Sequence, residues 1–116
     1  MSTETAICEI EKWAGQPLPV QYRELLPNIR NQVIGDRVYL YPPAIVIERN
    51  ETYETRKYCP GYITIGDDSG GSAFVIALAD EACEVYLVDH GSMDPECFES
   101  LGTCLREWIQ AQCPLK

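Results

Sequence analysis

Positive charge is scarce in this chain of 116 residues, where nine Lys and Arg stand against eighteen Asp and Glu, for a formal net charge of −9. Nucleic acids and anionic membrane surfaces are bound by clustered cations, so this balance argues against both classes of partner. Long apolar runs are also missing: the longest covers residues 73–79, whereas a membrane-spanning helix needs about 20 residues. No basic segment followed by an apolar stretch begins the chain, so we expect no signal peptide and a cytoplasmic location.

Common metal and nucleotide motifs are absent as well. No Cys-x-x-Cys pair occurs, and the single histidine, His90, completes no zinc-type set. No glycine-rich loop is followed by Lys-Ser or Lys-Thr, so we expect no nucleotide site and no cofactor. The six cysteines are predicted to be reduced and to pack as small apolar residues. They are Cys8, Cys59, Cys83, Cys97, Cys104 and Cys113.

What the sequence does contain is the composition of one globular domain. Hydrophobic residues make up 46% and charged residues 23%, which is the mixture of an ordinary folded protein. A chain of this length forms a single core. No internal repeat, low-complexity tract or linker divides it, so residues 1–116 are expected to form one domain.

Two helices are predicted at the amino-terminal end. Apolar residues recur on one face of residues 3–14, with charged residues opposite. Gly15 and Pro17 end this helix, and Pro19 suits the first position of a second one. Residues 15–18 would join the two as a helical hairpin. The buried stripe of the second helix would comprise Tyr22, Leu25, Leu26 and Ile29.

Strands are predicted at residues 37–41, 62–66, 73–79 and 85–88. The first alternates apolar and polar positions, as a half-buried strand does. Residues 73–79 are apolar throughout, which predicts a strand covered on both faces. The short connections between the later strands favour antiparallel pairing.

Residues 44–56 fit two structures. The β-branched run at residues 45–47 favours a strand, whereas the residues whose spacing fits one face of a helix are Val46, Asn50, Tyr53 and Lys57. The spacing favours the helix, and the strand stays open as the alternative.

A carboxyl-terminal helix is predicted from Asp94, which would cap it, and Pro95, which would open it, to a stop at Pro114. Helices first, strands next and a helix last describe an α+β domain. It would be a small, mainly antiparallel sheet on which the amino-terminal helical hairpin and the carboxyl-terminal helix pack. The apolar face of the last helix would comprise Phe98, Leu101, Leu105, Trp108 and Ile109, with Cys97 and Cys104 also on it.

The loop at residues 66–71 resembles the Gly-Asp-Ser-Gly-Gly string around the nucleophile of trypsin-like proteases. An extra Asp interrupts the string, the chain is too short for that fold, and His90 follows the serine instead of preceding it. We therefore interpret the loop as a turn in which Asp67 and Asp68 accept backbone N–H groups and the glycines adopt positive φ. Two adjacent carboxylates are also too few for a calcium site. Because a triad is recognised by geometry and not by sequence order, a small hydrolase using Ser69 or His90, with Asp89-His90 as an acid–base pair, stays open as a third and less favoured hypothesis.

The remaining functional signal is distributed acidity. Glu48, Glu51 and Glu54 lie at three-residue spacing, so a helix would place them in one sector of its surface. Further acidic residues follow at 67–68, at 80–81 and at Glu84. Such acidity serves either solubility or the binding of a basic partner.

Four strings, taken in order over nearly the whole chain, resemble the SUKH superfamily of Smi/Knr-type proteins. They are Leu18-Pro19-x-x-Tyr22-x-x-Leu25-Leu26; Tyr39-Leu40-Tyr41-Pro42; Ile65-Gly66-Asp67-Asp68-Ser69-Gly70-Gly71 with Phe74; and Val85-Tyr86-x-x-Asp89-x-Gly91-Ser92. The resemblance implies an α+β fold, favours a helix for residues 44–56, and brings no catalytic residue set.

The resemblance also implies two functions, neither of them enzymatic. Bacterial members are immunity proteins that bind and neutralise the toxic domain, often a nuclease, of a polymorphic or contact-dependent toxin. The alternative is a regulatory or scaffold module, as in the fungal relatives that regulate cell-wall synthesis. We expect a basic toxin domain as partner, and an exposed strand edge would permit a homodimer. The expected partner-binding residues are Glu48, Glu51, Glu54, Asp67, Asp68, Ser69, Glu84, Asp89 and His90.

Overall fold

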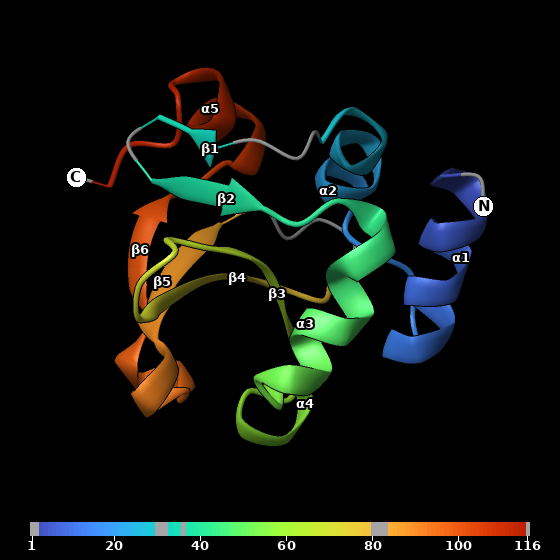
Figure 1. Cartoon of the computed structure of the whole chain (residues 1–116), viewed down its shortest axis with the longest axis horizontal. Helices are drawn as coiled ribbons and strands as arrows, with labels where there is room; N and C mark the ends of the chain where they lie inside the picture. Colours follow the sequence, from blue (N-terminus) through green and yellow to red (C-terminus); the bar gives the residue numbers. More distant parts are fainter. Residues whose placement is uncertain (1–2, 30–32, 36, 80–83, 116) are drawn as a thin grey trace.

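The computed structural model describes residues 3–29, 33–35, 37–79 and 84–115, which form an antiparallel sheet and the helices that pack against it (Figure 1). The sheet is a meander, because each strand pairs antiparallel with the next strand along the chain. The α+β prediction is therefore confirmed. The strands are β1 (Val33–Ile34), β2 (Val38–Leu40), β3 (Tyr62–Asp67), β4 (Ser72–Ala77), β5 (Val85–Asp89) and β6 (Glu99–Gly102).

The described helices lie beside the meander, and the first two form the predicted hairpin (Figure 1). Gly15 ends the first helix with a positive φ of 79°, a conformation that glycine adopts without strain. The Glu11 carboxylate accepts a hydrogen bond from the Leu18 N–H at 2.8 Å and fixes the turn into the second helix. The helices are α1 (Thr3–Ala14), α2 (Val20–Leu25), α3 (Val46–Thr52), α4 (Thr55–Tyr58) and α5 (Leu105–Gln110).

Both faces of the central strands are covered, as the apolar run at residues 73–79 predicts. One face of β4 carries Phe74 and Ile76 into the main core with α1, α2 and α5. The other face carries Ala73 and Val75 into a smaller cluster with Cys59, Val88 and Met93. We call these the helix face and the outer face of the sheet.

Strand β2 leaves the sheet early, and a side chain takes its place. The last bond between the two strands runs from the Tyr41 N–H to the Ile65 carbonyl, at 2.9 Å. At Thr64, one residue before Ile65, β3 pairs with a side chain instead. The buried Asn50 of α3 accepts the Thr64 N–H at 2.8 Å and donates to the Thr64 carbonyl at 2.9 Å. The amide thereby satisfies both backbone groups at the open edge of β3 and ties α3 to it.

The segment 44–56 is largely helical, but it does not form a single helix. A 3-10 turn at Pro43–Ile45 precedes α3, and the helical conformation is interrupted between α3 and α4. Glu54 lies at the break with a left-handed φ of 54°. The prediction that Glu48, Glu51 and Glu54 share one helix is therefore wrong for Glu54.

The predicted carboxyl-terminal helix is wrong over its first half. Asp94 and Pro95 do cap and open a helical turn, but it is a 3-10 turn that ends at Cys97. Residues 99–102 then form β6 against β5. This stretch includes Ser100 and Gly102, which have low helix propensity. Pairing with β5 satisfies the backbone hydrogen-bonding groups of the stretch. The expected apolar stripe is split, since Phe98 packs on the outer face whereas Leu105 and Trp108 enter the main core.

The cysteines depart from the expectation in part. The five described cysteines are free thiols. Cys59 and Cys113 are buried, as predicted, but Cys8 and Cys97 are exposed and Cys104 is half-buried. Cys97 and Cys104 also lie on different elements instead of on one helical face. The sixth position, 83, lies outside the described residues.

Candidate protein-interaction site

Two loops that the sequence analysis singled out lie together at one end of the sheet. Ser72, which follows the β3–β4 turn, pairs with Asp89 at the end of β5. The His90 N–H then donates to the Gly71 carbonyl at 2.7 Å. Asp67, Asp68 and Ser69 therefore share one end of the molecule with Asp89 and His90. We call this region, residues 67–71 and 89–91, the loop end.

The carboxylates of the loop end are fixed by backbone donors. Asp67 Oδ1 accepts the Ser69 N–H at 2.9 Å, and Asp68 Oδ1 accepts the N–H groups of Gly70 and Ser72 at 2.8 and 3.1 Å. Asp89 Oδ1 accepts the Gly91 N–H at 2.7 Å. The predicted acidic turn is thus confirmed.

The conformation expected of the glycines in this turn is wrong. Gly70 and Gly71 have no positive φ, and Ser69 carries the left-handed conformation instead, with φ of 62°. The side-chain acceptors of Asp67 and Asp68 hold the turn around it.

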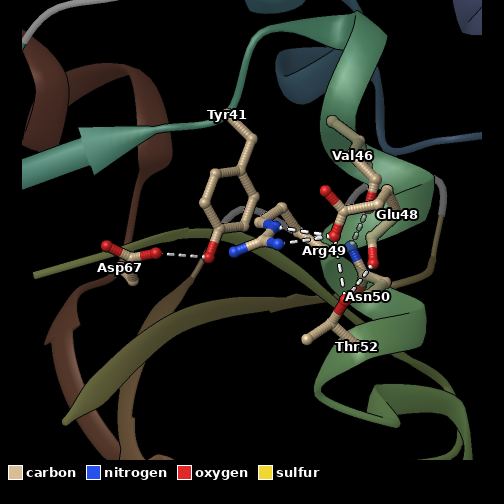
Figure 2. Close-up of polar contacts among 7 residues, drawn as sticks. All are labelled: Tyr41, Val46, Glu48, Arg49, Asn50, Thr52 and Asp67. Atoms are coloured by element: carbon tan, nitrogen blue, oxygen red, sulfur yellow. Dashed lines mark hydrogen bonds and ion pairs between the residues drawn. The ribbon is translucent and has the colours of Figure 1, made fainter. Parts of the chain in front are cut away.

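A buried tyrosine forms a hydrogen bond with a carboxylate of the loop end. The Tyr41 hydroxyl donates to Asp67 Oδ2 at 2.7 Å, and Figure 2 shows its ring reaching from the end of β2 toward that carboxylate. Burial, and then the bond to Asp67, raise the pKa of Tyr41 far above its ordinary value. The hydroxyl therefore stays protonated and acts as a permanent donor to Asp67.

One arginine lies among these acids. Glu48 Oε2 receives Arg49 Nη2 at 2.6 Å and Nε at 2.9 Å, and it also accepts the Thr52 hydroxyl at 2.8 Å. The hydrogen bonds from Arg49 and Thr52 hold the pKa of Glu48 below its usual range. In Figure 2 the guanidinium lies between Glu48 and the Tyr41 ring. Arg49 therefore compensates part of the acidity beside the loop end.

An aromatic stack joins α3 to the loop end. The rings of Tyr53 and His90 are stacked with centroids 4.1 Å apart, and the Arg49 guanidinium lies 5.7 Å from the Tyr53 ring centroid. Sequence reasoning named Glu48 and His90 but missed Tyr41, Arg49 and Tyr53. Tyr41 belongs to one of the family-like strings, whereas only the folded path of the chain brings Tyr53 onto His90. Arg49 reaches the stack through Tyr53, four residues further along the chain.

The other predicted residues lie elsewhere. Glu84 precedes β5 at the opposite end of the sheet and accepts the Tyr86 hydroxyl at 3.0 Å. Glu51 lines a cleft of about 300 Å³ between Trp13 and the α3–α4 break. Glu54 pairs with Lys57 at 3.4 Å. Positions 80 and 81 lie outside the described residues.

The described residues show no constellation typical of catalysis or metal binding. No hydrogen bond joins Ser69 to His90 within the described part of the chain, where the imidazole stacks on Tyr53. No group of three His, Cys, Asp or Glu side chains gathers there as metal ligands would. What the loop end offers is a set of fixed acceptors at the surface.

The net charge is confined to one part of the chain. Between Cys59 and Cys104 lie nine of the eighteen acidic residues and none of the nine basic ones. This segment, which holds β3 to β6, has a formal charge of −9, and the remainder of the chain is neutral. We call it the acidic segment; it includes the loop end.

The comparison with known protein families agrees with this architecture. The sequence model of the SMI1 / KNR4 family (SUKH-1) matches residues 1–110, so the chain belongs to this family. A search of curated proteins returned no match. Within the described ranges, none of the helices has the length and apolarity needed to cross a membrane. The family and the fold are consistent with an immunity or regulatory module that binds another protein.

Proposed function

We propose that this chain is a cytoplasmic immunity protein that binds a basic toxin domain and blocks its active site without doing chemistry. The observation that carries the proposal is the segregation of charge, since the whole net charge of −9 lies on residues 59–104. A toxin that acts on nucleic acid presents a basic cleft. A protein that opposes it with carboxylates of the acidic segment imitates the charge of its substrate.

Fixed carboxylates suit this role. Asp67, Asp68 and Asp89 are already held by backbone N–H groups, so little side-chain entropy is lost when a partner binds. Complementary fields also accelerate association, up to about 10⁸–10⁹ M⁻¹s⁻¹ at low salt. An interface of about 800 Å² on this side would cover roughly one eighth of the 6254 Å² surface.

The direct test is co-expression with any toxin domain that the genome encodes beside this chain. We expect growth to be rescued, the two proteins to purify together, and the activity of the purified toxin to be lost at a 1:1 ratio. Asp89→Arg, which places a cation at the loop end, is expected to weaken binding by at least about tenfold, since a like charge facing a basic surface costs several kcal/mol. Glu9→Arg makes the same change of charge on α1, an exposed helix, and is the matched control.

Failure to bind or protect against any neighbouring toxin would contradict the proposal. Recovery of an endogenous protein as the specific partner would instead favour the regulatory or scaffold alternative. The homodimer through a strand edge stays a prediction, which the molar mass in solution would test.

A further inference from the structure

Three aromatic rings form a patch at the end of the sheet opposite the loop end. Phe98 stacks on Tyr86 with ring centroids 5.2 Å apart and meets the edge of Tyr62 at 4.9 Å. Tyr62 and Tyr86 are themselves 6.2 Å apart. The rings come from β3, from β5 and from the segment that precedes β6. We call these three residues the aromatic patch.

The patch lies on the outer face of the sheet. Its rings pack against the small cluster that contains Val75 and Cys59. Those inner residues are fully buried, whereas all three rings are half-buried. The rings therefore cover the cluster and present part of their own surface to solvent. Exposed aromatic surface of this kind is typical of contacts with other molecules.

One carboxylate is bonded to the patch, and the acidic segment that carries the patch has no Lys or Arg. Glu84 accepts the Tyr86 hydroxyl at 3.0 Å, and Glu96 is exposed two residues before Phe98. Asp94 follows Met93, a member of the cluster that the rings cover. Burial, and then the Asp94 carboxylate, raise the pKa of the Cys59 thiol. The patch thus combines ring surfaces with negative charge.

We propose that the aromatic patch receives an arginine side chain of the basic partner, whose guanidinium stacks on the rings while the carboxylates of Glu84 and Glu96 face its charge. The inference rests on the proposed function. Ring faces attract cations, and the planar guanidinium stacks on them in a way that the ammonium of lysine does not. The patch would provide a second contact, on a different surface from the loop end, and would favour arginine over lysine.

The first experiment uses synthetic nona-arginine and nona-lysine peptides with the full chain. Nuclear magnetic resonance titration is expected to shift the amide signals of Tyr62, Tyr86 and Phe98 more with nona-arginine than with nona-lysine. Nona-arginine should also bind about two- to fivefold more tightly, the ratio that one exposed cation–π contact supplies. Equal affinity for both peptides, or shifts confined to the loop end, would overturn the inference without any variant.

A double variant then removes the ring faces and keeps the apolar cover. Tyr86→Leu with Phe98→Leu should abolish the preference for nona-arginine and weaken binding of the neighbouring toxin domain. Tyr58→Leu is the matched control, because Tyr58 is 49% exposed and lies outside the patch. Circular dichroism and urea unfolding establish that each variant is folded.

The outcomes separate this inference from the proposed function. A toxin domain that binds wild type and double variant equally tightly overturns the aromatic contact and leaves the immunity role standing. A chain that binds no toxin but retains the arginine preference at the patch overturns the immunity role and supports the cation site.

Discussion

Tyr22 and Tyr41 are both fully buried, but their hydroxyls have different surroundings. Tyr41 donates to Asp67, whereas the Tyr22 hydroxyl forms no hydrogen bond with any described residue. Burial raises the pKa of both phenols above the ordinary value. A buried hydroxyl without a partner costs free energy that phenylalanine would not.

Tyr22→Phe is therefore expected to leave stability at pH 7 unchanged or to raise it by about 1 kcal/mol. In the unfolded chain, tyrosine loses its proton near pH 10, whereas the folded chain retains it. The contribution of Tyr22 to stability is thus complete below about pH 10 and is lost as the pH rises toward the folded pKa. The variant should lose less stability between about pH 9 and pH 11, by up to about 1.4 kcal/mol per pH unit.

Urea unfolding across that pH range measures this effect. Tyr41→Phe provides the comparison, since it also removes a titrating phenol but should cost about 1 kcal/mol or more at pH 7 through the lost bond to Asp67. If the free energy of unfolding depended on pH in the same way for Tyr22→Phe and the wild type, the raised pKa of Tyr22 would be contradicted.

At the scale of elements, the contact between α3 and β3 organises the region beside the loop end. Asn50 bonds both backbone groups of Thr64 and also donates to the Val46 carbonyl at 2.8 Å. The hydroxyls of Thr55 and Thr64 meet at 2.8 Å, which adds α4 to the same anchor. Arg49 precedes Asn50 and Tyr53 lies three residues after it, so this anchor fixes their position relative to His90.

Asn50→Ala should lower the free energy of unfolding by about 2–4 kcal/mol, because it leaves two buried backbone groups of Thr64 without partners. Asn28→Ala is the matched control: its amide makes one long, exposed bond of 3.4 Å to the Glu24 carbonyl, and a change within about 0.5 kcal/mol is expected. Urea unfolding compares the two. Equal effects would show that the Asn50 amide does not support the edge of β3.

Local signals account for the elements that the sequence predicts well. Gly15, Pro17 and Pro19 delimit the helical hairpin, and the apolar run in β4 identifies a doubly covered strand. At residues 98–109 the three- and four-residue spacing also fits a helix, and the competing strand depends on an available edge of β5. Such an edge exists only in the folded protein. The interruption at Glu54 also depends on a tertiary contact, because the change of direction before α4 brings the Thr55 hydroxyl to the Thr64 hydroxyl.

For the whole molecule, the decisive property is where the charge lies. The candidate residues at the loop end were predictable, since each occurs in a turn string or beside the single histidine. The segregation of charge was also visible in the sequence, because it requires only counting Lys and Arg between Cys59 and Cys104. The stack of Tyr53 on His90 was not, because it joins segments separated by β3, β4 and β5.

Association with the toxin domain should therefore depend on salt and on the location of the charge. Raising the salt from about 50 to 500 mM should slow association by about tenfold or more, since exposed charges are screened. A triple variant with Asp89→Asn, Glu96→Gln and Glu99→Gln should reduce this salt dependence. A second triple variant with Glu4→Gln, Glu9→Gln and Glu107→Gln changes the net charge equally but should behave as the wild type.

Stopped-flow measurements give the association rate of each variant at low and at high salt. Equal salt dependence in the two triple variants would mean that net charge alone, and not its location, drives the encounter.

The meander order of the sheet has a consequence for how quickly the protein becomes competent to bind. Every strand pairs with its neighbour along the chain, so most of the sheet assembles by closing short loops, at a small entropic cost. Topologies of this kind fold rapidly. The long-range step is the docking of α5 on α2, where Gln21 accepts the Arg106 N–H at 3.0 Å. We therefore expect the acidic segment of a newly synthesised chain to fold before α5 docks on α2.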